Sequence, residues 1–238
     1  MAVHMKRKVG VMLLALSVVL SVALAGMMVW ANIEAIYYGF PHITNNHLTT
    51  LHCPHFMAWD ETTWISARVS NTTDHLATVG VKSWVSVPLA WELKTEYRKL
   101  KPGEQWVWMR RIGPENRELR HFIFASVYVF GGYPMPERQS MCGVYVLPLR
   151  GVRGEAAMWG AIVLILVVLF VGLVLWRRAG GEAHSGVVAS RVMHFFAVMV
   201  PVTLAVALWM NWTLGIVVLV IDVLMVIIVG LSFVMYME

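Results

Sequence analysis

The stretch HFIFASVYVF, residues 121 to 130, is nearly continuously apolar and predicts a strand in the middle of a sheet. Four neighbouring stretches alternate apolar and polar residues, which is typical of strands with one buried face: TTWISARVSN (62–71), ATVGVKSWVSV (77–87), EQWVWMRRI (104–112) and SMCGVYVLPL (140–149). Clusters of turn-forming residues separate them, at 70–74, 101–104, 113–116 and 131–137. Short strands with this spacing predict an antiparallel β-sandwich.

One segment of this region, LAWELKTEYRKL (89–100), has a helical period instead. Two interpretations stay open for it, a short helix and a strand that leaves a sheet edge.

The turn sequences VSN (69–71) and LKPGE (100–104), with the strands around them, resemble immunoglobulin-like domains of bacterial extracytoplasmic proteins. The resemblance covers roughly residues 51 to 149. It implies a fold but no activity, because that family has no shared catalytic residues to carry over.

The composition indicates a membrane protein, since 58% of the residues are hydrophobic and only 14% are charged. Ordinary soluble domains carry roughly 25% charged residues. Two charge-free runs, Val9–Ile33 and Ala156–Trp176, each match the roughly 20 residues of one bilayer crossing. The run from Val192 to Glu238 is long enough for two crossings and predicts a hairpin that turns at Asn211; the alternative is one long helix kinked at Pro201.

Basic residues set the orientation of these spans. Lys6, Arg7 and Lys8 precede the first span, and Arg177, Arg178 and Arg191 follow the second, so both clusters are expected in the cytoplasm. The predicted organisation is a basic segment with the first span (1–33), an extracytoplasmic sandwich (34–154), a second span (155–177), a cytoplasmic loop (178–191) and a helical hairpin (192–238). Both termini are then cytoplasmic, in a multi-pass protein of the inner membrane. The alternative for residues 1–25 is a cleaved signal sequence, because small residues follow the apolar run at ALAG (23–26).

The formal net charge of +5 reflects mostly the two cytoplasmic clusters. The chain has no aromatic-interleaved basic patch, so a nucleic-acid partner is not expected.

Cys53 and Cys142 are the only cysteines, and they stand at opposite ends of the predicted sandwich. First and last strands of a sandwich often lie close together, so we expect a disulfide between them on the oxidising side of the membrane. The alternative is a copper site built from His52, Cys53, His55 and Met57. Adjacent residues of a strand point to opposite faces, which disfavours His52 and Cys53 as joint ligands. The histidine-rich segment 42–55 has two interpretations, a solvated linker and a metal-binding segment.

Two further features are candidates for contacts with other subunits. Trp106 and Trp108 share one face of their strand, either as an exposed anchor for a partner or as part of the core. Asp222 is the only acidic residue within a predicted span, near the bilayer middle. We consider three roles for its carboxyl group: a hydrogen bond to Thr203 within the hairpin, a pairing with a cation on a helix of another subunit, and part of a proton or ion pathway.

The sequence therefore predicts a non-catalytic accessory or structural subunit of a larger bacterial membrane complex. Its expected partners are other membrane subunits and the lipid bilayer, and the sequence identifies no cofactor and no small-molecule substrate. The alternative is a metal-binding or redox subunit, associated with copper or haem, that uses residues 42–55.

Overall fold

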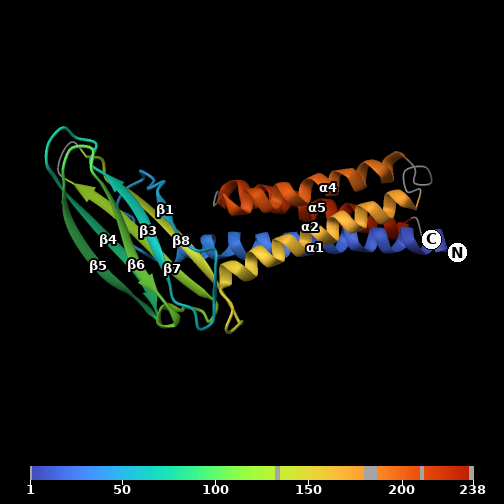
Figure 1. The fold of residues 1–238 in the computed structure, drawn as a ribbon, viewed down its shortest axis with the longest axis horizontal. Helices are drawn as coiled ribbons and strands as arrows, with labels where there is room; N and C mark the ends of the chain where they lie inside the picture. Colours follow the sequence, from blue (N-terminus) through green and yellow to red (C-terminus); the bar gives the residue numbers. More distant parts are fainter. Residues whose placement is uncertain (1, 132–134, 180–186, 210–211, 236–238) are drawn as a thin grey trace. The chain divides into compact units, whose positions relative to one another are not determined.

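The computed structural model describes residues 2–131, 135–179, 187–209 and 212–235. The chain divides into two compact units (Figure 1). One unit, Trp30–Ala157, holds all the described strands; the other consists of Met1–Val29 and Met158–Glu238 and is helical.

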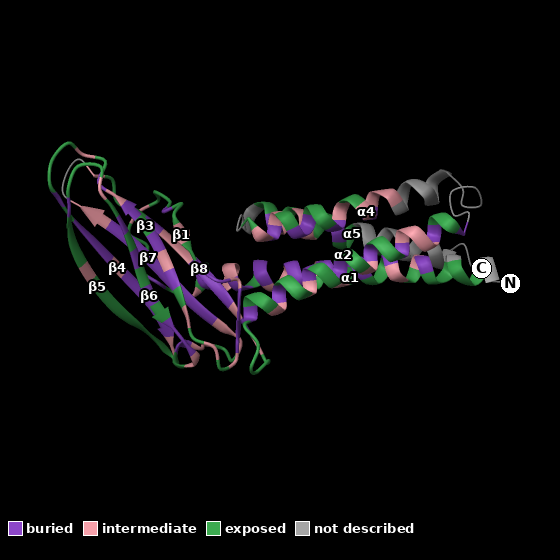
Figure 2. Ribbon diagram, viewed as in Figure 1, coloured by how far each residue is buried: buried purple, intermediate pink, exposed green. Residues whose placement is uncertain are grey.

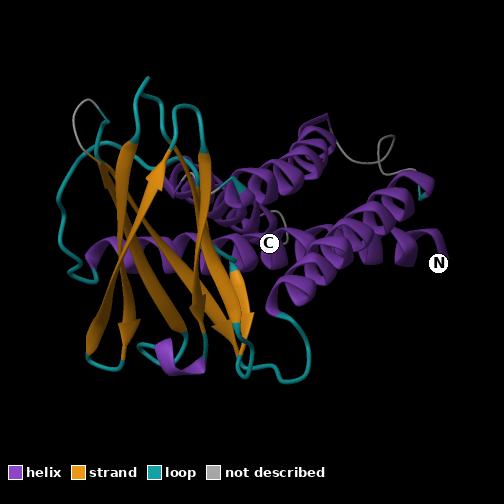
Figure 3. Cartoon of the chain, turned by 60° about the vertical axis from the view of Figure 1, so that its left-hand side comes forward, coloured by secondary structure: helices purple, strands orange, loops and turns teal. Residues whose placement is uncertain are grey.

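Two sheets form the β unit, and Figure 3 shows them as two layers. The smaller has the order β1-β3-β6 and the larger the order β2-β8-β7-β4-β5. The strands are β1 (Leu51–His52), β2 (Phe56–Ala58), β3 (Thr63–Ser70), β4 (Ala77–Val87), β5 (Ala90–Leu100), β6 (Gln105–Ile112), β7 (Phe122–Gly131) and β8 (Arg138–Leu147), with a 3-10 turn, η1 (Pro114–Asn116), before β7. The five predicted strands are all present, as β3, β4, β6, β7 and β8.

One feature of the sheets differs from the predicted antiparallel arrangement, and one open alternative is decided. β2 runs parallel to β8, with Phe56 opposite Tyr145. The ambiguous segment 89–100 is not a helix: it forms β5, which pairs with β4 along its whole length. Its pairing partner decides the conformation, because long-range pairing overrides a local helical period.

The core lies between the sheets and is filled by alternate residues of the strands. From the small sheet come Ile65, Ala67, Trp108 and Ile112, and from the large sheet Val79, Val81, Ile123, Val127 and Val144, none more than 1% exposed. Alternation along β6 is strict, with every second residue buried.

The large sheet is also covered on its outer face, which explains why residues 121–130 are nearly continuously apolar. Phe124, Tyr128 and Trp84 point to that face and form a buried cluster with Ala35 and Phe40. A strand that is buried on both faces has mostly apolar residues at successive positions.

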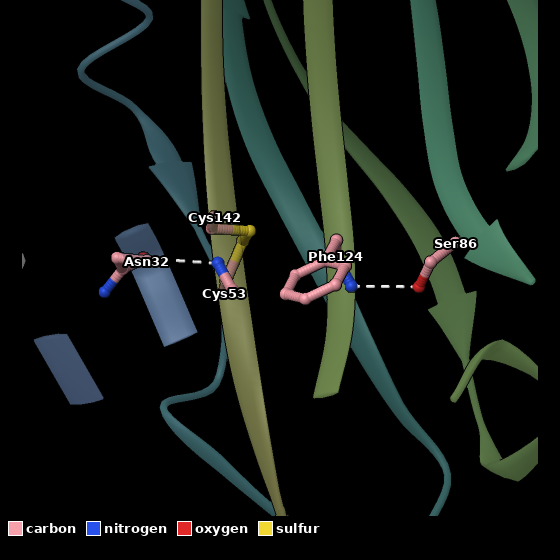
Figure 4. Close-up of a disulfide and its surroundings, with 6 residues drawn as sticks. Asn32, Cys53, Ser86, Phe124 and Cys142 are labelled. Atoms are coloured by element: carbon pink, nitrogen blue, oxygen red, sulfur yellow. Dashed lines mark hydrogen bonds between the residues drawn. A yellow bond between two sulfur atoms is a disulfide. The ribbon is translucent and has the colours of Figure 1, made fainter. Parts of the chain in front are cut away.

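Gly143 of β8 permits the close approach of the last turns of α1 (Ala2–Tyr37) to this outer face. A Cβ atom at Gly143 would overlap the carbonyl group of Ala31. The Gly143 N–H donates to Oδ1 of Asn32 at 3.2 Å, beside the disulfide (Figure 4).

The described helices are α1, α2 (Gly154–Arg178), α4 (Val187–Leu208) and α5 (Trp212–Met235). Two described stretches are long and apolar enough to cross a membrane, Lys8–Tyr37 and Gly154–Arg178; the first, near the N-terminus, also fits a signal sequence. α4 begins at Val187, so the end of the predicted cytoplasmic loop, 187–191, is helical. The predicted turn at Asn211 falls outside the described residues.

Within the helical unit, glycines bring α1 and α2 together. A Cβ at Gly10 would lie 2.8 Å from the backbone nitrogen of Trp176, and one at Gly172 would lie 3.0 Å from that of Leu14. Such close backbone contact through small residues is typical of helices that associate in a bilayer.

Candidate interaction surface

Strand β5 is one edge of the large sheet, because β4 is its only neighbour among the strands that the structure describes. All of its eleven residues are exposed except Glu96 and Leu100, and Figure 2 shows it mostly in the colour of exposed residues. At about 3.4 Å per residue the edge is roughly 37 Å long. An exposed edge of this length presents unpaired backbone N–H and C=O groups to any further strand.

One face of β5 carries an apolar stripe formed by Trp91, Leu93 and Tyr97. These side chains are 44%, 52% and 65% exposed, respectively. Two of the three contact aromatic residues of the protein itself, since the Trp91 ring packs edge-on against Phe40 and the Tyr97 ring against Phe130. The two aromatic side chains are therefore fixed in position but remain accessible to a partner. Tyrosine and tryptophan are enriched in binding hot spots.

The opposite face of β5 carries charges of alternating sign: Glu92, Lys94, Glu96 and Arg98. The Lys94 Nζ atom lies 2.8 Å from Oε1 of Glu96 on the same strand. Charges on an edge strand oppose nonspecific association with other chains, but they allow pairing with a strand whose charges are complementary.

Arg110 of β6 fixes β5 from inside the domain. Its guanidinium is only 6% exposed and donates to the carbonyl and hydroxyl oxygens of Ser83 at 2.7 and 2.9 Å, and to the carbonyl of Glu92 at 3.2 Å. The Glu92 carboxylate lies 3.1 Å away. Burial lowers the pKa of Arg110, and the Glu92 charge acts in the opposite direction. Arg110 thus joins the small sheet to both β4 and β5.

The turn that leads into β5 is strained. Leu89 has φ 64°, which L-residues rarely adopt, and its side chain is 96% exposed. Its N–H donates to Oε2 of Glu118 at 2.9 Å, and the hydroxyl of Tyr38 donates to the carbonyl of Ala90 at 2.6 Å. Burial, with the charge of Glu118, raises the pKa of Tyr38 to about 12. The strain is therefore balanced by bonds that fix where β5 begins.

An open pocket lies beside this turn. Leu89, Leu119 and Arg120, the described non-glycine residues with positive φ, all line it. Its wall includes Trp59, with the guanidinium of Arg117 3.8 Å above the ring centre.

The cysteines are paired as predicted, since Cys53 and Cys142 form a disulfide with a Cα–Cα distance of 6.5 Å (Figure 4). Both are buried, at 0% and 2% exposed. The bond ties the connection between β1 and β2 to β8.

This pairing removes Cys53 from the alternative copper set. A disulfide sulfur is not the thiolate that a copper site requires. Of the other proposed ligands, His52 is exposed on β1, whereas Met57 on β2 is 1% exposed. Within the described ranges no three residues among His, Cys, Asp and Glu form a group suited to a metal ion.

The proposal that Trp106 and Trp108 form an exposed partner anchor is wrong. They do share one face of β6, but that face points into the core, where they are 9% and 1% exposed. The exposed face carries Val107 and Met109, at 56% and 49%. Both faces of this strand contain apolar residues, and the larger ones fill the interior.

Asp222 of α5 accepts a hydrogen bond from the Thr203 hydroxyl of α4, which was one of the three roles considered for its carboxyl group. Both side chains are buried, at 3% and 2% exposed. A role of Asp222 in contacting another subunit stays a prediction.

Comparison with known proteins gives likenesses in structure only. No family model and no curated protein matches the chain. The CARDB domain of a Pyrococcus furiosus protein in complex with di-metal ions matches 42% of this chain and 90% of that domain, with 13% identity and a TM-score of 0.34. A Bacteroides uniformis β-glucuronidase matches 37% of the chain with 15% identity and a TM-score of 0.31; a Listeria innocua β-glucosidase matches 40% with 14% identity and a TM-score of 0.29.

The matched part spans only 12% of the length of that glucuronidase and 15% of the glucosidase. Neither the activity of these enzymes nor the metal ions of the CARDB domain are transferred to this chain.

Proposed function

We propose that this protein is a non-catalytic accessory subunit of a larger bacterial membrane assembly and that β5 is its docking surface. The observation that carries the proposal is the stripe of Trp91, Leu93 and Tyr97 on a long free edge. Contact through such an edge supplies backbone hydrogen bonds for affinity and side chains of alternate residues for specificity.

The membrane anchor is part of the proposal. We propose four crossings, by α1, α2, α4 and α5, with both termini in the cytoplasm and an immunoglobulin-like β unit outside. Two long apolar helices and the basic residues Lys6, Arg177 and Arg178 support this topology. Both chain connections of the β unit lie near one edge of the large sheet, Ala31 against Gly143 of β8 and Gly154 against Met57 of β2. β5 is the opposite edge and is left for partners.

Co-purification in mild detergent tests the docking surface. The full-length variant with Trp91→Ser, Leu93→Ser and Tyr97→Ser should lose the subunits that co-purify with the native chain. The matched control is Val107→Ser with Met109→Ser, which removes exposed apolar side chains of similar exposure from β6. The control should keep the partners. Retention of every partner by the β5 variant would refute this surface.

Labelling in intact cells tests the topology. A cysteine introduced at Thr72, an exposed residue of the turn before β4, should react with a membrane-impermeant maleimide. A reporter that is active only in the cytoplasm should be active when it is fused after Glu238. An external C-terminal reporter would mean that the last run crosses once.

A further inference from the structure

We infer that β5 binds the β5 strand of a second copy of this chain, in antiparallel register about Thr95. This inference rests on the proposed function, because it names the occupant of the same edge. The charge pattern of the strand supports this pairing, because the pattern is complementary to the same pattern read in the opposite direction.

In this register residue n faces residue 190 − n of the second copy. Lys94 then lies opposite Glu96, and Glu92 lies opposite Arg98. A two-fold axis repeats each pair, so four oppositely charged pairs form along one face of the joined sheet. Cross-strand pairs of opposite charge stabilise neighbouring strands, and like charges directly opposite destabilise them.

The apolar face fits the same register. Leu93 lies opposite Tyr97 of the second copy, and this pair also occurs twice. Trp91 lies opposite Lys99, whose ammonium group suits the face of an indole ring. The open stripe is thereby paired on the face opposite the charges.

Neighbouring registers lack this match. Centring the axis on Lys94 places Glu92 opposite Glu96 and Lys94 opposite itself. Centring it on Glu96 places Lys94 opposite Arg98. A slip by one residue sets the apolar face against the charged one. Charge and apolar pattern therefore select one alignment.

Each of these charged side chains already has a partner within its own chain, and a second strand would share or replace these partners. The pairs are Glu92 with Arg110, Lys94 with Glu96 and Arg98 with Glu104. The side chains of Glu92, Lys94 and Arg98 are 63%, 56% and 51% exposed. The Lys94–Glu96 and Arg98–Glu104 pairs are partly exposed, and ion pairs of this kind contribute little to stability, so pairs between strands can replace them. The joined sheet has ten strands, with the chain connections at Gly143 and Gly154 toward its two outer ends.

Cysteine cross-linking of the full-length protein in detergent tests the register. Facing residues of an antiparallel pair have Cα atoms about 5 Å apart, within disulfide range. Thr95→Cys should therefore form a covalent dimer under mild oxidation. Tyr97→Cys is the control: its Cα atoms lie four residues apart along the strands, roughly 13 Å, and should not cross-link. Leu93→Cys combined with Tyr97→Cys should cross-link. Equal dimer yields at positions 95 and 97 would overturn the register.

Charge reversal tests the pairing without cross-links. Lys94→Glu and Glu96→Lys each place like charges opposite each other, so each variant alone should self-associate about tenfold more weakly than the native chain. Mixed together, the two variants restore opposite charges between chains although both keep like charges within their own strand. The mixture should therefore form heterodimers with near-native affinity. Absence of this rescue overturns the inference.

The two proposals fail separately. If the native chain is monomeric at every concentration, yet the serine variants of the β5 stripe lose a different subunit, the inference is overturned and the proposed function stands. If β5 variants change no association of any kind, both are overturned.

Discussion

The guanidinium of Arg110 on β6 reaches the carboxylate of Glu92 on β5, with Nη2 3.1 Å from Oε2. The contact connects the filled interior of the β unit with the strand that we propose as its docking surface. An edge strand with one neighbour frays easily, because half of its backbone groups lack a partner. Arg110 opposes that fraying from the core side.

Replacing Arg110 by methionine should lower the free energy of unfolding by about 2 kcal/mol, because the oxygen atoms of Ser83 lose their buried donors. Arg111→Met, on the exposed face of the same strand, should change it by less than about 0.5 kcal/mol. Chemical denaturation in detergent measures both. Equal effects of the two substitutions would show that the contacts of Arg110 do not stabilise the β unit.

The disulfide should be complete in the native protein. Thiol labelling of the unfolded, unreduced chain should find no free cysteine, and reduction should expose both. Cys53→Ser with Cys142→Ser should destabilise the β unit by about 4 kcal/mol, since the bond closes a loop of 89 residues. Two labelled thiols before reduction would contradict the pairing and reopen the copper interpretation.

Gly143→Val should displace the last turns of α1 from β8. The new side chain meets the carbonyl of Ala31, and overpacking of this kind costs typically about 1–3 kcal/mol. Gly26→Ala is the control, because a Cβ there meets nothing within 4 Å. Limited proteolysis near Phe40 reports the displacement, with faster cleavage expected for Gly143→Val alone.

Asp222 should matter for assembly more than for transport. Asp222→Leu should loosen co-purification of partner subunits, and Asp222→Asn should be milder because an amide still accepts from Thr203. Interhelical bonds of this kind contribute about 0.6 kcal/mol on average and at most about 2. If Asn impairs activity of the complex as much as Leu while the assembly stays intact, Asp222 carries protons instead.

Much of this fold follows from local patterns, and the exceptions have physical reasons. The alternation in 62–71 and 77–87 predicted β3 and β4. The helical period of 89–100 comes from Leu89, Leu93, Tyr97 and Leu100, yet only Leu100 is buried. The conformation of an edge strand depends on pairing with its neighbouring strand, and the local sequence pattern holds no information about that pairing. The three-residue strand β2 is too short to show any pattern.

The candidate site was less accessible to prediction. The sequence predicted that Trp106 and Trp108 share one face of β6. It could not predict which face points inward, because Val107 and Met109 on the other face are apolar too. The β5 stripe could not be identified from the sequence, because exposure is a property of the assembled sheet. The alternating charges from Glu92 to Arg98 can be seen in the sequence. They indicate a pairing partner only once the strand is known to be an edge strand.

Photo-crosslinking in intact cells tests most directly whether β5 is the docking surface of this protein. A photoreactive side chain replaces Leu93 on β5 in one variant and Val107 on β6 in the other, two residues of similar exposure. Irradiation should give discrete cross-linked products from position 93 and none from position 107. Products from position 107 alone, or equal products from both, would contradict the assignment of β5 as the docking surface.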